Sequence, residues 1–170
     1  INTDAYNNGF VISECLFQSC SSGHFGGAIT IGSEHVGITI KQTVFANSSA
    51  AQGGAFYLDD QNSNVTIDGC NFTSSSALIN GGAIGVNSSN AYVAVLNSVI
   101  TDSNGGLAGG AIAVWTWNPH FSFVNSTISA ASAGAGGGIY FETSNTNVLI
   151  EDSLIQGSTA TEVSGGAIWM

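Results

Sequence analysis

Short runs in which apolar and polar residues alternate recur along the whole chain. Around Ile29 and again around Ile38, every second residue is apolar. This period of two predicts strands with one buried face. Turns rich in Gly, Asn, Ser and Asp separate the runs, and no stretch shows a convincing 3.6-residue apolar stripe. In this part of the chain, strands are expected at about residues 28–31, 37–41 and 43–46.

The alternating runs belong to a repeat of 27 to 29 residues, and such a period decides the architecture. A large apolar residue follows each Gly-Gly pair, and a second apolar pair begins nine residues later. Length variation falls in the Ser/Ala/Gly-rich stretch before the next Gly-Gly pair. The Gly-Gly pairs begin at Gly26, Gly53, Gly81, Gly109, Gly137 and Gly165. The large residues that follow them are Ile29, Phe56, Ile84, Ile112, Ile139 and Ile168.

Three short strands in each repeat predict an all-β fold, a parallel β-helix of about six coils. Equivalent residues of successive coils should then lie about 4.8 Å apart and form columns along the axis. The six large residues that follow the Gly-Gly pairs are expected to form one apolar ladder. We expect a single β-helix segment over residues 1–170, uncapped at both ends and part of a longer chain or filament, because the chain opens on Ile1 and stops at "GGAIWM".

The "GGAI" strand, the apolar strand pair and the following "F-x-x-S" stretch together resemble a known repeat. It is the repeat of the polymorphic outer membrane proteins and their relatives, in the pectin-lyase-like superfamily of right-handed parallel β-helices. The resemblance covers the chain from Ile1 to Met170 and implies a right-handed coil. Similar repeats occur in surface adhesins, autotransporter passenger domains and large extracellular proteins of algae and other protists. Where that family usually has the Asn of F-x-x-N, this chain has Cys20, Ser48, Ser75, Ser103, Ala131 and Ser158.

Composition narrows the choice of function. The 170 residues are 44% apolar but only 7% charged, with 23 glycines, a single proline and a net charge of −10. Because Lys41 is the only basic residue besides histidine, nucleic acid and anionic membrane surfaces are disfavoured as partners. No run is long and apolar enough to span a membrane, so no membrane insertion is expected within this segment.

The three cysteines are expected to be buried thiols without a bridge. Cys15 and Cys70 belong to one inward column of small residues but are two coils apart, about 9.6 Å on the strand spacing, which is too far for a disulfide. Cys20 belongs to another column. Cysteine usage therefore says little about the redox compartment.

Catalysis is not expected, although pectate lyases, pectin lyases and polygalacturonases share the fold. Those enzymes gather acidic residues on one face, with calcium and a basic residue, or converge several aspartates on one bond. Here Asp59 and Asp60 are the one local acidic pair, interpreted as a solvated turn with a surface calcium ion as the minor alternative. His24, His35 and His120 share no column, so neither a metal site nor a cofactor is expected.

Binding is the better hypothesis, because aromatic residues occur at positions that the strand phase points outward. Exposed rings on a rigid polar scaffold often stack on sugars or dock a partner. Trp115 could equally fold over a neighbouring coil and cover Gly-rich backbone, and this alternative is left open. The candidate interaction surface consists of Tyr57, Tyr92, Trp115, Trp117, Tyr140 and Trp169.

Five Asn-x-Ser/Thr sequons could accept glycans if the chain is secreted by a eukaryote. Asn64 and Asn71 are the better candidates, because the strand phase points both outward. The five acceptor asparagines are Asn47, Asn64, Asn71, Asn87 and Asn125.

The sequence thus favours a structural or adhesive segment of an extracellular or cell-surface protein, acting as a rigid shaft or filament subunit and not as an enzyme. Its partners would be further copies of itself, other extracellular proteins or glycans. The alternative is a non-catalytic fragment of a polysaccharide lyase or glycoside hydrolase. An ice-binding solenoid is a weaker hypothesis, because the outward column with Thr39 and Thr66 loses its threonines in the later coils.

Overall fold

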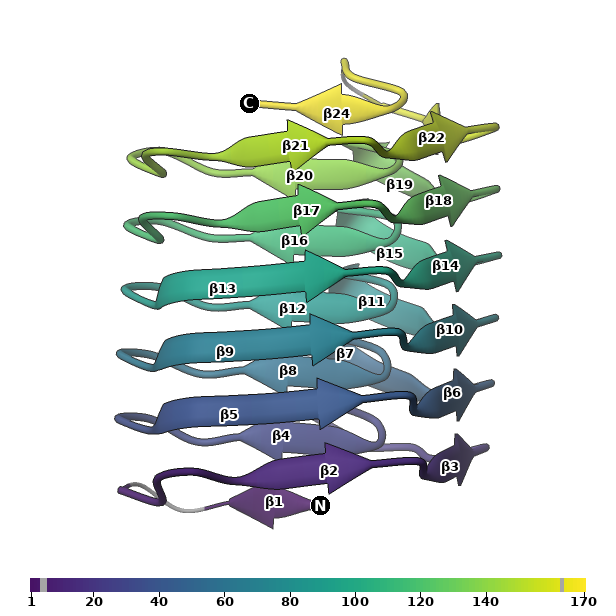
Figure 1. Cartoon of the computed structure of the whole chain (residues 1–170). Coiled ribbons are helices and arrows are strands. Elements are labelled where there is room, and N and C mark those ends of the chain that lie inside the picture. Colours follow the sequence, from purple (N-terminus) through teal and green to yellow (C-terminus); the bar gives the residue numbers. More distant parts are fainter. Residues whose placement is uncertain (4–5, 163) are drawn as a thin grey trace.

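The structure, a computed structural model, describes residues 1–3, 6–162 and 164–170. Over these residues the chain forms a parallel β-solenoid of about six coils, with no helix (Figure 1). The strands form four parallel sheets, here called A, B, C and D in the order in which the chain visits them within a coil. The predicted all-β parallel coil is confirmed.

In each coil, one strand of sheet A and one strand of sheet B carry most of the large apolar residues that point into the tube. Sheet A consists of β1 (Asn2–Thr3), β4 (Ile29–Ile31), β8 (Phe56–Leu58), β12 (Ile84–Val86), β16 (Ile112–Val114), β20 (Ile139–Phe141) and β24 (Ile168–Trp169). Sheet B consists of β2 (Val11–Ser13), β5 (Val36–Lys41), β9 (Ser63–Asp68), β13 (Ala91–Leu96), β17 (Ser122–Val124) and β21 (Leu149–Glu151).

Sheets C and D complete each coil. Sheet C consists of β3 (Leu16–Gln18), β6 (Val44–Ala46), β10 (Asn71–Thr73), β14 (Val99–Thr101), β18 (Thr127–Ser129) and β22 (Leu154–Gln156). Sheet D consists of β7 (Ser49–Gln52), β11 (Ser76–Asn80), β15 (Asn104–Ala108), β19 (Ser132–Ala135) and β23 (Thr159–Ala160).

The coil is right-handed. In Figure 1 the strands of sheet B run from left to right in front, those of sheet A run from right to left behind them, and each later coil lies above the previous one. This is the usual hand of a crossover between parallel strands.

The apolar anchors form the predicted ladders inside the tube. Strand pairing places the large residues after the Gly-Gly pairs in one register, from Ile29 through Phe56 to Ile168. In sheet C, the rings of Phe45 and Phe72 stack in parallel with centroids 4.5 Å apart. Burial of these side chains supplies the main driving force for folding, at roughly 25 cal/mol per Å² of apolar surface.

Sheet D is an element that the apolar pattern did not predict. Its strands lie in the Ser/Ala/Gly-rich stretches, where small residues give no alternation to detect. The length variation does fall here, as expected. Strands β11 and β15 shift register against their shorter neighbours β7 and β19, and the shifts leave Leu78 and Leu107 exposed on the surface.

Each coil turns by means of five residues with left-handed backbone conformation. They form five columns, and in four of these columns most residues are not glycine, including Gln61, Tyr92 and Trp117. The fifth column is glycine in every coil and consists of Gly26, Gly53, Gly81, Gly109, Gly136 and Gly165. In the fifth repeat the pair therefore begins at Gly136, one residue earlier than the sequence spacing indicated.

Both glycines of each pair are required by close approach of backbone. A Cβ at the first glycine, for example Gly81, would overlap the carbonyl oxygen of Ile84 in the same coil. A Cβ at the second, Gly82, would overlap the carbonyl oxygen of Gly110 in the next coil. The Gly-Gly pair thus permits both the turn into sheet A and the stacking of one coil on the next.

The column that contains Cys15 lies inside the tube between sheets B and C and does more than fill space. The Ser98 hydroxyl donates to Leu96 O at 2.7 Å and accepts from the backbone N–H of Cys70 at 3.1 Å. In the same way, the Ser126 hydroxyl donates to Val124 O and accepts from the backbone N–H of Ser98. These hydroxyls join successive coils.

The three thiols are free, but the expectation that all are buried is wrong. Cys70 is buried, Cys20 is half-buried and Cys15 is exposed. Cys15 and Cys20 belong to the first coil of the described chain, so no coil covers them from below. Burial raises the pKa of the Cys70 thiol.

Replacing Gly82 by Ala should destabilise the protein by at least about 3 kcal/mol, because the new methyl group overlaps the Gly110 carbonyl and the Asn104 backbone. Urea denaturation followed by circular dichroism measures the effect. Gly23→Ala is the matched control, since a Cβ there meets no atom within 4 Å. Equal stability of the two variants would contradict the assigned role of the Gly-Gly pair.

Alkylation of the native protein with iodoacetamide should modify Cys15 first and Cys70 only after unfolding, because the Cys70 thiol is buried and its pKa is raised. Peptide mapping by mass spectrometry identifies the labelled residues. Labelling of native Cys70 at the rate of Cys15 would show that the core is open.

Candidate interaction surface

The turn from sheet A to sheet B, here called the A–B turn, is held by a column of buried asparagines. Asn90 accepts a hydrogen bond from the N–H of Asn62 in the coil below, at 2.9 Å. Its amide donates to the carbonyl oxygens of Asn87 and Ser88 within its own turn, at 2.9 and 3.3 Å. Each asparagine thus closes its own turn and bonds to the previous coil.

This asparagine ladder consists of Asn62, Asn90, Asn118 and Asn145. Successive members are 28, 28 and 27 residues apart, which is the coil period. A search of the sequence for one residue type repeated at this period would have found the ladder. His35 precedes it, and its N–H donates to Asn62 Oδ1 at 2.8 Å.

Because the ladder fixes the backbone from inside, the outward residues of the A–B turn are free to vary. Asp59, Asn87, Trp115 and Glu142 occupy the same place in successive coils, and the N–H of each bonds to the coil below. At Asn118, the side-chain amide holds the carbonyl oxygens of Trp115 and Thr116 at 3.0 and 3.2 Å. The ladder therefore positions Trp115 directly.

Three of the predicted aromatic residues come together on the outer side of sheet A. Tyr140 and Trp169 are register partners, and their rings stack with centroids 4.6 Å apart and 5° between the planes. Trp115 meets Tyr140 edge-on, with centroids 6.4 Å apart. All three are half-buried. Burial and the neighbouring Glu142 carboxylate raise the pKa of Tyr140, which keeps its phenol neutral.

Trp117 extends this group into the A–B turn. Its side chain is 66% exposed, and its backbone is left-handed, like that of Ser89 and Ser144 in the neighbouring coils. We call Trp115, Trp117, Tyr140 and Trp169 the aromatic surface. Trp115 packs on Tyr140 of the next coil and is half-buried, and its part in an interaction surface stays a prediction.

Tyr92 is the second residue of β13, just after the A–B turn, and is 55% exposed. Its ring stacks on His120 of the next coil, with centroids 4.6 Å apart and 5° between the planes. His120 is therefore a packing partner of Tyr92. These two rings form a separate exposed pair near the entry to sheet B.

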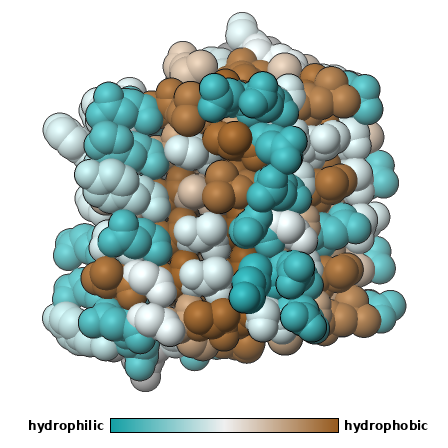
Figure 2. Space-filling view, in the orientation of Figure 1, coloured by the Kyte–Doolittle hydropathy of each residue, from teal (hydrophilic) through white to brown (hydrophobic). Residues whose placement is uncertain are grey.

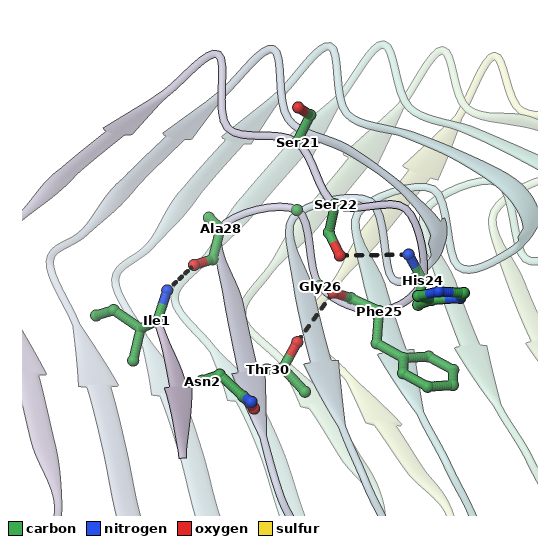
Figure 3. A pocket seen from close by; sticks show the side chains of 10 residues that line it. Ile1, Asn2, Ser21, Ser22, His24, Phe25, Gly26, Ala28 and Thr30 are labelled. Carbon is green, nitrogen blue, oxygen red and sulfur yellow. Dashed lines mark hydrogen bonds between the residues drawn. The ribbon is translucent and has the colours of Figure 1, made fainter.

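Tyr57 is not part of the exposed surface, although its position in the strand points outward. It is only 2% exposed, because the ring of Phe25 covers it at a centroid distance of 4.5 Å. Figure 3 shows Phe25 on the loop that precedes β4, held by the hydrogen bond from Thr30 Oγ1 to its carbonyl oxygen. The loop before β4 thus covers an outward residue of β8 in the next coil, which strand phase alone does not reveal.

The acidic pair Asp59 and Asp60 takes part in the contacts between coils. Asp59 accepts hydrogen bonds from Asn87 Nδ2 at 3.1 Å and Ser33 Oγ at 3.3 Å. Asp60 accepts from the N–H of Ser88 at 3.0 Å. Burial raises the pKa of Asp60, and the Ser88 hydrogen bond offsets this in part. Both carboxylates are therefore structural acceptors and not simply solvated side chains.

Within residues 1–3, 6–162 and 164–170, no three His, Cys, Asp or Glu side chains are grouped so that they could hold a metal ion. An open hollow of about 370 Å³ lies beside the loop shown in Figure 3. Among the side chains that line it, His24 is the one ionisable group.

The five sequon asparagines fall into two groups. Asn47, Asn64 and Asn71 are exposed, as the strand phase predicted for the last two. Asn87 is half-buried and its amide donates to Asp59. Asn125 is exposed, but its amide donates to Asn97 Oδ1 at 2.7 Å.

Sheets B and C carry rows of side chains that run from coil to coil. Figure 2 shows alternating hydrophobic and hydrophilic stripes along the axis on this face. The outward row of sheet C includes Leu16, Val44 and Leu154, which are 64%, 37% and 50% exposed. Thr39 and Thr66 are register partners in sheet B, where the row continues into Ala94.

Comparison of the chain with protein-family models, with curated proteins and with solved structures gave no match. The parallel β-solenoid architecture follows from the strand pairing described above. In the described part of the chain, no helix has the length and apolar character needed to cross a membrane.

Asn118→Ala should cost about 2 to 4 kcal/mol, because it leaves the N–H of Asn90 and the carbonyl oxygens of Trp115 and Thr116 without buried partners. Tryptophan fluorescence should become easier to quench with iodide as the turn loosens. Asn71→Ala, at an exposed position of strand β10 in sheet C, is the control. Unchanged stability and quenching at Asn118 would refute the positioning role of the ladder.

Proposed function

We propose that this chain is a rigid structural or adhesive segment of an extracellular or cell-surface protein, and that its aromatic surface contacts the partner. The observation that carries the proposal is the gathering of Trp115, Trp117, Tyr140 and Trp169 on adjacent coils of a scaffold that fixes their backbone from inside.

Rigidity is supported by the way in which coils are joined. Four parallel sheets run along the axis. Between coils, further side-chain hydrogen bonds come from the asparagine ladder and from Ser98 and Ser126 in the column that contains Cys15. Local bending would have to break several of these bonds together. A shaft or filament subunit needs this property, whereas a mobile linker does not.

Binding through the aromatic surface is supported by ring exposure and charge. Trp117 offers a largely free indole, while Tyr140 and Trp169 offer the edges of a stacked pair. Aromatic rings combine a large apolar area with polar groups, which suits both sugar rings and protein interfaces. With a net charge of −10, the chain should prefer neutral or cationic partners.

A non-enzymatic role is supported by the use of the ionisable groups. Lys41 pairs in register with Asp68, whose carboxylate accepts a hydrogen bond from Asn97 at 2.6 Å. Asp59 and Asp60 are engaged by the neighbouring coil. These groups stabilise the surface of the solenoid and do not converge on one point.

We further infer that the repeats are of the polymorphic outer membrane protein type. The Gly-Gly turn and the Phe ladder of sheet C have clear structural roles here. The position of the Asn in F-x-x-N corresponds to a buried polar column between sheets C and D, which contains Ser48 and Ser75. Extracellular adhesins carry similar repeats, which supports the proposed location.

A double variant, in which both new residues are copied from neighbouring coils, tests the binding role of the aromatic surface. Trp117→Ser and Tyr140→Ala introduce residues that neighbouring coils carry at the same positions, so the fold should be retained. On an array of neutral and acidic oligosaccharides, the native chain should bind members of the neutral class, and the variant should lose about tenfold or more in affinity.

Leu154→Thr is the control, because it removes an exposed apolar side chain from sheet C and copies its register partner Thr127. It should leave binding unchanged. Equal binding by the double variant, with native circular dichroism, would remove the aromatic surface from the proposal.

A further inference from the structure

One exposed sequon lies directly below an aromatic ring of the next coil. Strand pairing joins Ser63 to Ala91 and Val65 to Val93, so the residues between them, Asn64 and Tyr92, occupy the same column. Both have left-handed backbone, with φ of 55° and 57°. Their backbones are therefore one strand spacing apart, about 4.8 Å.

One face of the Tyr92 ring is covered by His120 of the coil above, nearly parallel and 4.6 Å away. A stack with this spacing lies along the solenoid axis, so the second face of Tyr92 points toward the coil of Asn64. Tyr92 is 55% exposed even with His120 stacked on it.

Asn64 also has the features required of an acceptor. It begins the sequon Asn64-Val65-Thr66 and is exposed. By contrast, the amides of Asn87 and Asn125 are engaged in hydrogen bonds to Asp59 and Asn97. Asn47 and Asn71 are exposed as well, but the register neighbours of Asn71 are Val44 and Val99.

We propose that Asn64 carries an N-linked glycan whose first sugar packs on the second face of Tyr92. The apolar face of a pyranose ring matches an aromatic ring in area, and Asn64 presents the sugar one coil below it. The sugar would continue the stack that His120 and Tyr92 begin. This inference rests on the proposed extracellular location, because the modification takes place in a secretory pathway.

The covalent step uses a lipid-linked diphosphate oligosaccharide as the donor. The Asn64 amide nitrogen forms a bond to the anomeric carbon, and the bond between that carbon and the diphosphate oxygen breaks. The lipid diphosphate leaves with the bonding electron pair, and the amide proton passes to a base of the transferring enzyme. No oxidant or reductant is required.

The test compares four chains secreted from eukaryotic cells behind a cleavable signal: the native chain, Asn64→Gln, Tyr92→Asn and the double variant. Tyr92→Asn copies Asn147, which has left-handed backbone in the same column. Glycans are trimmed to the single sugar attached to asparagine. Peptide mapping gives the occupancy of each sequon, and calorimetry gives the melting temperature.

Asn64 should be occupied, and Asn64→Gln should lower the melting temperature by about 2 to 4 °C when Tyr92 is present. In the Tyr92→Asn background the same change should have a clearly smaller effect, limited to the loss of an asparagine at a left-handed position. Asn71→Gln is the matched control, and its effect should not depend on residue 92. The four chains made in bacteria, without glycan, should show no such coupling.

An unmodified Asn64 peptide beside an occupied Asn71 peptide would overturn the proposal. So would an equal effect of Asn64→Gln in both backgrounds. These outcomes are independent of the oligosaccharide array, because occupancy and melting can succeed while array binding fails, and the reverse. Failure of the inference and failure of the proposed function are therefore distinguishable.

Discussion

The close approach of neighbouring backbones at the Gly-Gly turn constrains the whole solenoid. At Gly54, as at Gly82, a single added carbon would overlap the carbonyl oxygen of the corresponding glycine in the next coil. Because this contact fixes how one coil rests on another, the register of all four sheets follows from it. The apolar ladders can then pack with like residues directly above one another, as Phe45 and Phe72 do.

The same constraint explains which parts of the fold the sequence could predict. The glycine column and the large residues after it are forced by sterics and burial, so they recur at every coil and reveal the period. Sheet D could not be found in this way, because its small residues bury little and show no alternation. The other left-handed positions were also hidden, since Tyr92 and Trp117 are not residues from which such a backbone is normally inferred.

The candidate site was only partly predictable for a related reason. Strand phase tells whether a side chain leaves the tube, but not whether another segment covers it. Tyr140 and Tyr57 have the same phase, yet Tyr57 is buried against Phe25 from the loop of the coil below, whereas Tyr140 stays half-buried. The asparagine ladder was detectable from its period. No apolar pattern reveals these buried amides, although Asn62, Asn90 and Asn118 each make three side-chain hydrogen bonds inside the tube.

Internal and external residues of this solenoid therefore have separate tasks. At the A–B turn, Asn62, Asn90 and Asn118 hold nearly the same backbone, while the outward residues beside them change from Asp59 to Asn87 to Trp115. The free energy that maintains the turn comes from buried amides, so a change of outward side chain alters the surface without altering the coil. A protein built in this way can place rings, sequons or carboxylates at any height along its axis. The clustering of aromatic residues from Trp115 onward is then a property of the surface alone, because the two preceding coils, with the same internal ladder, carry Asp59 and Asn87 in that place.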